Sequence, residues 1–122
     1  PQIRFFKSLP RNVFVNLMRN TKALIGNSSM GILEAPFYKV PVINIGNRQK
    51  GRLNAGNVKY EGYDIGKIKS SLEQACFDEE YRTIINGIKS PFGDGFAAQN
   101  IVNILSSIDL NDSKWLVKRK LC

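Results

Sequence analysis

The sequence contains no histidine and only two cysteines among its 122 residues. Without histidine, the chain cannot supply a Ser-His-Asp triad, a histidine-ligated metal site or an imidazole acid–base catalyst. Its cysteines, Cys76 and Cys122, form no CxxC unit, which argues against a structural zinc site and against a disulfide framework. We therefore expect no metal and no cofactor, and we expect the chain to work in a reducing compartment, the cytoplasm.

Long apolar runs are missing as well, because none approaches the roughly 20 residues that a membrane span requires. No basic segment followed by an apolar one opens the chain, so nothing argues for secretion. The first residue is Pro1 rather than methionine, which predicts a processed chain or a fragment. With 43% hydrophobic residues the chain can bury a core. We predict one domain over residues 1–110 and a basic tail over residues 111–122.

The chain carries 18 Lys and Arg against 10 Asp and Glu, a formal charge of +8. Such an excess would suit RNA binding. However, no RRM, KH or helix-turn-helix pattern is present, and aromatic residues are not interleaved with the basic ones. A nucleic-acid-binding module without chemistry therefore stays an alternative, and it predicts steeply salt-dependent binding to RNA.

Strand-like and helix-like segments alternate along the chain over short connections. Strand-like runs occupy residues 3–6, 23–26, 40–45 and 57–60, and helical spacing marks residues 11–20, 64–76, 78–87 and 97–108. We expect Ser8 to cap the first helix, with Pro10 in its first turn. This order predicts an α/β fold, a Rossmann-like parallel sheet of about four strands with helices on both faces.

The segment 26–34, GNSSMGILE, follows a predicted strand and opens a predicted helix. Ligands of open α/β sheets bind at the carboxyl ends of strands, and a helix N-terminus adds roughly half a positive charge there. Ser28 and Ser29 add hydroxyl donors, so a phosphate or pyrophosphate is the expected guest, and Glu34 is placed to accept from ribose hydroxyls. The alternative is that Asn27 or Ser28 only caps the helix, with Glu34 as the partner in a capping box.

A basic loop over residues 47–52 also follows a predicted strand, so it should lie at the same edge of the sheet. Arg48, Lys50 and Arg52 could hold phosphate oxygens by charge-assisted hydrogen bonds. The alternative is a solvated basic loop without a ligand. The shared edge favours the binding interpretation.

Three blocks of this sequence, in this order, resemble the UDP-N-acetylglucosamine 2-epimerase family. They are GNSSxGIxEAP over residues 26–36, PVINIGxRQxGR over residues 41–52, and PFGDG over residues 91–95. The forms of the first two blocks are more similar to the hydrolysing branch, which makes N-acetylmannosamine or related sugars for sialic-acid-like pathways. The resemblance covers all but about the last dozen residues.

The resemblance implies an enzyme of the glycosyltransferase-B type, with two Rossmann-like domains and the active site in the cleft between them. This chain would be most of the C-terminal, UDP-binding domain, without the catalytic N-terminal domain, and the full-length protein would be a homo-oligomer. Its ligand would be UDP or a UDP-sugar, with no nucleic acid and no membrane as partner. An enzyme of the same fold acting on a 2,4-diacetamido sugar or on a glycosyl-transfer substrate is the alternative.

The resemblance also assigns residues. Ser28, Ser29 and the N–H groups of Met30 and Gly31 would bind the diphosphate. Glu34 would bind the ribose hydroxyls, and Phe14 would lie near the uracil. Arg52 and Arg48 would face the diphosphate or the sugar across the cleft. The implied reaction eliminates UDP and then adds water to the glucal with inversion at C2. The carboxylates for those steps belong to the absent domain, so Arg52 is the one catalytic candidate here, and the chain alone should bind a nucleotide and catalyse nothing.

Overall fold

A computed structural model describes residues 3–109, 111 and 112 of the chain. These residues fall into two compact units, which divide between Phe92 and Gly93. Of the basic tail predicted over residues 111–122, only Asn111 and Asp112 lie within the described part of the chain. The first unit holds the sheet and both of the loops on which the functional prediction rests.

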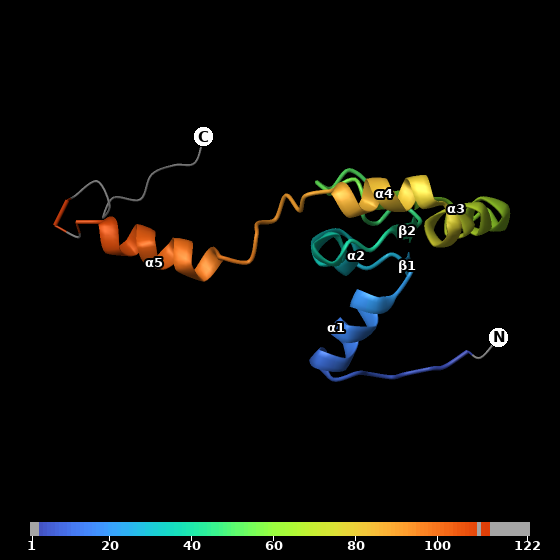
Figure 1. Cartoon of the computed structure of the whole chain (residues 1–122), viewed down its shortest axis with the longest axis horizontal. Helices are drawn as coiled ribbons and strands as arrows, with labels where there is room; N and C mark the ends of the chain where they lie inside the picture. Colours follow the sequence, from blue (N-terminus) through green and yellow to red (C-terminus); the bar gives the residue numbers. More distant parts are fainter. Residues whose placement is uncertain (1–2, 110, 113–122) are drawn as a thin grey trace. The chain divides into compact units, whose positions relative to one another are not determined.

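The first unit is built on three parallel strands, β1 (Leu24–Gly26), β2 (Val42–Ile45) and β3 (Val58–Glu61), in the order β1-β2-β3 (Figure 1). Leu24 pairs with Val42, and Val42 pairs with Val58. Only the central strand β2 is buried on both faces, whereas Ile25 in β1 is 46% exposed and β3 is half-buried throughout. The parallel sheet that the alternating pattern predicted is therefore confirmed for three strands.

The strand predicted at residues 3–6 is wrong, because this segment pairs with no strand in the structure. Phe5 is 91% exposed and Phe6 is 59% exposed. Four residues of strand-like composition do not specify a partner, and a strand exists only where its backbone groups find one.

One face of the sheet is covered by α1 (Arg11–Asn20), α2 (Met30–Leu33) and the 3-10 helix η1 (Ala35–Tyr38). Leu24, Val42 and Val58 are in register, so their side chains point to this same face. There Leu24 and Val58 pack against a buried cluster from α1, η1, the connection after η1 and β2: Met18, Ala35, Val40 and Val42. The predicted helical stripe that ends near Asn20 is confirmed, but its cap is not Ser8, since Pro10 stands at the N-cap without a side-chain bond.

The second predicted helix divides in two near Pro36. Its α-helical part, α2, has only four residues, and η1 begins directly after Glu34 with Pro36 in its first turn. Proline has no N–H to donate, and it disfavours α-helical backbone at the residue before it. The α-helix that follows the serine segment therefore has a single turn, and its dipole is correspondingly weak.

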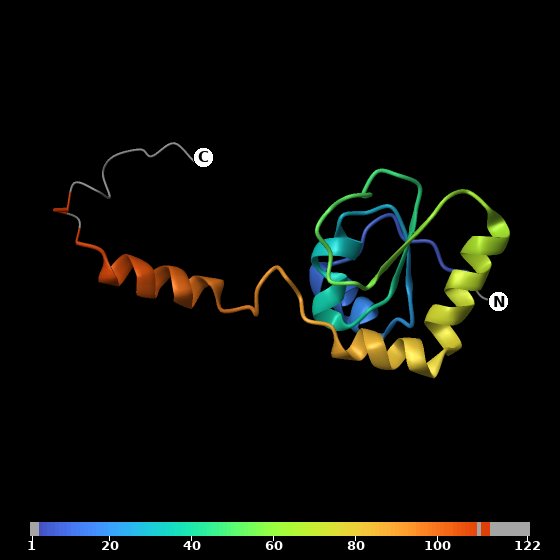
Figure 2. The same cartoon turned by 90° about the horizontal axis from the view of Figure 1, so that it is seen from above.

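The opposite face is covered by α3 (Ile65–Phe77), and α4 (Glu79–Gly87) continues from α3 across the end of the sheet where β1 begins, with Arg82 Nη1 donating to Lys22 O at 3.2 Å (Figures 1 and 2). The hydroxyl of Ser71 on α3 donates to Glu61 Oε1 at 2.5 Å, and Lys59 Nζ donates to Gln74 Oε1. Asp64 and Asp78 cap these two helices by accepting from backbone N–H groups, each at 2.9 Å. Helices therefore cover both faces, and the predicted Rossmann-like α/β fold is confirmed.

The second unit contains α5 (Ala97–Ser107), close to the predicted bounds of the final helix. None of its residues is buried, and its large apolar side chains are between 54% and 61% exposed: Ile101, Val102, Ile104 and Leu105. Within the part of the chain that the structure describes, no helix has the length and apolarity needed to cross a membrane.

Candidate functional site

The serine loop (residues 27–29) connects the end of β1 to the start of α2. Gly26 ends β1 with φ +149°, a backbone conformation that residues with a Cβ rarely adopt, although open space surrounds the position of a Cβ. The turn therefore requires glycine because of the backbone conformation at position 26, and not because a side chain would collide with a neighbour. It leaves Asn27 and Ser28 exposed and Ser29 at the N-cap of α2.

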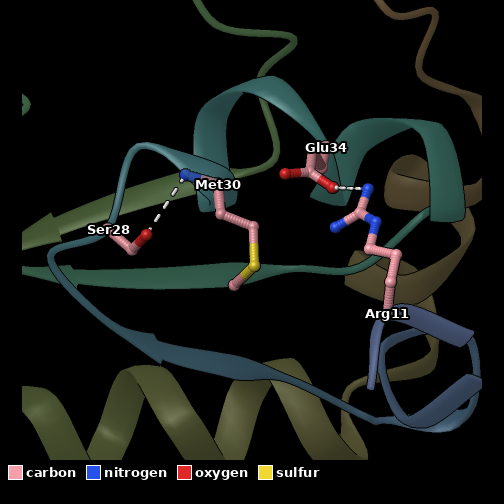
Figure 3. A network of polar contacts seen from close by, with 4 residues as sticks. All are labelled: Arg11, Ser28, Met30 and Glu34. Carbon is pink, nitrogen blue, oxygen red and sulfur yellow. Dashed lines mark hydrogen bonds and ion pairs between the residues drawn. The ribbon is translucent and has the colours of Figure 1, made fainter. Parts of the chain in front are cut away.

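The first N–H groups of α2 are held within the serine loop by long hydrogen bonds. Met30 N donates to Ser28 Oγ at 3.3 Å, and Gly31 N donates to Ser28 O at 3.2 Å (Figure 3 shows the first). The cap interpretation was wrong in its residue, because the N-cap is Ser29 rather than Asn27 or Ser28, and the Ser29 side chain makes no capping bond. The Ser28 side chain, one residue before the N-cap, accepts from Met30 N. Its hydroxyl accepts in this bond, so its own hydrogen remains available for an anion. The Ser29 hydroxyl makes no hydrogen bond to any described residue.

Gly31 sets how closely α2 approaches the sheet. It is buried, and a Cβ built on it would lie 2.8 Å from Val42 Cγ1 and 3.5 Å from Leu24 Cδ2. A contact of 2.8 Å is essentially never seen for a real Cβ, so a side chain here would force α2 and Val42 apart, whereas the 3.5 Å distance to Leu24 is an ordinary contact. This packing fixes the serine loop against the carboxyl end of β1.

Glu34 is the residue directly after α2, at the C-cap of this helix. Its Oε2 accepts a charge-assisted hydrogen bond from Arg11 Nη2 at 2.5 Å, and both side chains are partly solvent-exposed (Figure 3). Its other carboxylate oxygen, Oε1, accepts no hydrogen bond from any described residue. The carboxylate is therefore oriented by α1 while one oxygen stays open.

Phe14 lies on α1, half-buried against the core cluster. The guanidinium carbon of Arg11 is 5.9 Å from the centre of its ring. Phe14 also lines an apolar hollow of ≈ 440 Å³, together with Leu9, Leu17, Met18, Asn20, Thr21 and Leu24. Phe14 is thus partly a core residue and partly the wall of a surface hollow.

The basic loop (residues 47–52) follows β2, as the sequence predicted, and it lies in the connection 46–57 that leads to β3. Arg48, Lys50 and Arg52 are exposed, whereas Gln49 between them is only 2% exposed. Gly46 and Gly51 have φ angles of +78° and +80°, and these two left-handed residues bend the loop back on itself.

Gln49 joins the two loops. Its Nε2 donates to Asn27 O in the serine loop at 3.0 Å, and its Oε1 accepts from Arg52 Nη1 at 2.8 Å. The hydroxyl of Tyr60 on β3 donates to the backbone oxygen of Gln49 at 3.3 Å. The expectation that both loops lie at the same edge of the sheet is confirmed. Arg48, by contrast, makes no hydrogen bond or ion pair with any described residue.

Sequence reasoning missed the burial of Gln49, because a polar residue in a charged loop is ordinarily solvated. The available signal was its place in the block PVINIGxRQxGR, where it stands beside the arginine residues. The structure therefore brings Ser28, Ser29 and Arg52 to one edge, and Arg48 is exposed there without a bond to any described residue.

The three-stranded parallel sheet, covered by helices on both faces and with two polar loops at its carboxyl edge, defines an α/β domain of the Rossmann-like class. A family model described as UDP-N-acetylglucosamine 2-epimerase matches residues 1–106. The chain therefore belongs to the UDP-N-acetylglucosamine 2-epimerase family, and the resemblance that its motifs indicated is confirmed.

Three curated relatives illustrate this membership. The chain is 44% identical over 77 residues to GDP/UDP-N,N'-diacetylbacillosamine 2-epimerase (hydrolyzing) of Campylobacter jejuni, covering 62% of this chain and 20% of the relative. It is 38% identical over 71 residues to UDP-N-acetylglucosamine 2-epimerase of Neisseria meningitidis, covering 58% and 19%. It is 29% identical over 111 residues to UDP-N,N'-diacetylbacillosamine 2-epimerase (hydrolyzing) of Legionella pneumophila, covering 91% and 28%. The chain thus spans less than a third of the length of each.

Proposed function

We propose that this chain is the UDP-binding part of the C-terminal domain of a hydrolysing UDP-N-acetylglucosamine 2-epimerase. The whole enzyme would convert UDP-N-acetylglucosamine to N-acetylmannosamine and UDP. The observation that supports this most directly is the 3.0 Å hydrogen bond from Gln49 to Asn27, because it joins the serine loop to the basic loop. Two polar loops at the carboxyl edge of a parallel sheet are the usual place for a nucleotide.

The diphosphate would lie between the two loops. Ser28 and Ser29 would donate their hydroxyl hydrogens, and the N–H groups of Met30 and Gly31 would exchange their long internal bonds of 3.3 and 3.2 Å for shorter, charge-assisted ones. Arg52 has one guanidinium nitrogen bound to Gln49, which leaves its other N–H groups for phosphate oxygens. The exposed Arg48 would reach the diphosphate or the sugar.

The nucleoside would extend from the serine loop toward α1. The open oxygen of Glu34 would accept from the ribose hydroxyls while Arg11 holds the other oxygen at 2.5 Å. The hollow of ≈ 440 Å³ beside Phe14 is apolar and offers an aromatic wall for the uracil ring. Binding would therefore use α1, α2 and both loops of the first unit.

In the proposed reaction, the sugar C1–O bond breaks, a proton leaves C2, and UDP departs to give a glucal. Water then adds across the double bond with inverted configuration at C2. This chain would stabilise the negative charge that develops on the departing diphosphate, which is usually the largest single contribution to catalysis of this kind. The groups that move protons would come from the absent N-terminal domain. Arg52 is the one catalytic candidate in this chain, and the chain alone would be inactive.

A second candidate is a hydrolysing epimerase that acts on a 2,4-diacetamido sugar nucleotide. The observation that favours it is the 44% identity to the Campylobacter jejuni protein, whose name specifies diacetylbacillosamine. Both candidates share the UDP-binding residues, so assays of the full-length enzyme on both sugar nucleotides distinguish them.

The free thiol of Cys76 suits a reducing compartment, and we propose a cytoplasmic homo-oligomer.

An NMR titration of the 122-residue chain with UDP, at low and at high salt, tests the binding proposal. Without the partner domain, we expect a Kd of about 0.1–1 mM. Saturable shifts confined to residues 26–34 and 48–52 are the expected result. A folded chain without any saturable shift would refute UDP binding by the chain itself. Titration with a single-stranded RNA then tests the nucleic-acid alternative, which requires strong and steeply salt-dependent binding.

A further inference from the structure

Gln49 is buried in the middle of an exposed loop. It is 2% exposed, while Asn47, Arg48, Lys50 and Gly51 around it are all exposed. A buried side-chain amide destabilises a protein unless its donor and acceptor are both bonded. Both are bonded here, the donor to Asn27 O and the acceptor to Arg52 Nη1. The side chain of Gln49 therefore connects the serine loop to Arg52 and does not point into solvent.

We infer that Gln49 is a positioning residue that fixes the Arg52 guanidinium relative to the serine loop, and so prepares the site for a diphosphate. The two bonds of its amide, 3.0 and 2.8 Å long, set the separation between the backbone of the serine loop and the arginine. The hydroxyl of Tyr60 on β3 also donates to the backbone oxygen of Gln49 at 3.3 Å, which connects Gln49 to the sheet. We call the two hydrogen bonds of the Gln49 amide the bridge. This inference rests on the proposed UDP site.

We expect the bridge to raise the affinity for UDP by ordering Arg52 before the ligand binds. A free arginine side chain on a surface loop samples many rotamers, and ordering it on binding reduces affinity. Arg52 is held in advance through one N–H, while Arg48 and Lys50 have no such partner among the described residues. Loss of the bridge should therefore weaken UDP binding by about fivefold to tenfold, through Arg52 alone.

The test is a cycle of four forms of the 122-residue chain: the unaltered sequence, Gln49→Met, Arg52→Met and the double variant. Methionine keeps the length and approximate volume of glutamine but removes both hydrogen bonds. We expect Gln49→Met to weaken UDP about fivefold to tenfold where Arg52 is present, and to change the affinity by less than about twofold where Arg52 is already methionine. Ile85→Val, a conservative change at a buried residue of α4, is the control for loss of stability, and it should leave UDP affinity unchanged.

A second measurement needs no ligand. NMR of the Arg52 guanidinium should show hindered rotation about the Nε–Cζ bond in the unaltered chain and fast rotation in Gln49→Met. Equal UDP affinity of Gln49→Met and the unaltered chain overturns the inference, and so does an equal loss in both Arg52 backgrounds. Free rotation of Arg52 in the unaltered chain overturns it as well. If the unaltered chain binds no UDP, the proposed binding function of the chain fails, while the rotation measurement still decides whether Gln49 positions Arg52.

Discussion

Replacing Gly31 by alanine tests whether the close approach of α2 to the sheet supports the candidate site. The new Cβ would lie 2.8 Å from Val42 Cγ1 and 3.4 Å from Val42 Cγ2, so helix or strand must move apart. Overpacking of this kind destabilises by about 1–3 kcal/mol, and the higher helix propensity of alanine offsets up to ~1 kcal/mol. We therefore expect a loss of about 1–2 kcal/mol in the free energy of unfolding, a fall in Tm of roughly 4–16 °C for a unit of this size.

Thermal and urea unfolding of Gly31→Ala, Val42→Ala and the double variant measure whether the contact between positions 31 and 42 causes this loss of stability. Val42→Ala removes the two methyl groups nearest the new Cβ, so in Gly31→Ala/Val42→Ala the collision disappears. The double variant should then lose less stability than the two single variants together, by at least about 0.5 kcal/mol. Additive losses, or a Gly31→Ala variant that melts with the unaltered chain, would refute the close-packing argument.

Three further predictions concern the site and the helix caps. Ser28→Ala and Glu34→Ala should each weaken UDP binding in the NMR titration and leave RNA affinity unchanged; equal UDP binding by both would reject these assignments. Gly26→Ala should lower the free energy of unfolding by about 1–3 kcal/mol through backbone strain alone, since φ is +149° and no atom lies near its Cβ; an unchanged urea midpoint contradicts this. The Tyr81 backbone N–H lowers the pKa of the Asp78 carboxyl, and the Gln74 side chain adds to this. The resulting stability is complete above the unfolded-state pKa and is lost as the pH falls through the lowered folded-state pKa, so Asp78→Asn should flatten the acid limb of stability against pH; parallel acid limbs would reject the link.

The elements with strong periodicity or a clear chemical boundary could be predicted from the sequence. The helices at residues 65–77 and 79–87 begin directly after Asp64 and Asp78, which accept from the backbone N–H groups of the first turns. The strands β1 and β2 are short, apolar and bounded by Gly and Pro. In each case the local residues determine the local structure, so one sequence is sufficient.

The misjudged elements depend on distant partners or on one residue. Phe5 and Phe6 have strand-like chemistry, but no strand lies beside them in the described structure. Pro36 shortened the helix after the serine loop, and its effect on the backbone was visible in the sequence. The burial of Gln49 could not be derived from periodicity, because it follows from a hydrogen bond to a residue 22 positions away.

The order of the sheet has a consequence for how the chain folds during synthesis. Each described strand pairs only with its neighbour in the sequence, β1 with β2 and β2 with β3. As the chain leaves the ribosome from its N-terminus, every new strand therefore meets an edge that has already been made. Pairing between sequence neighbours keeps each loop closure as short as the crossover of a parallel pair allows. All three described strands have emerged once Glu61 has left the ribosome, before α5 does so.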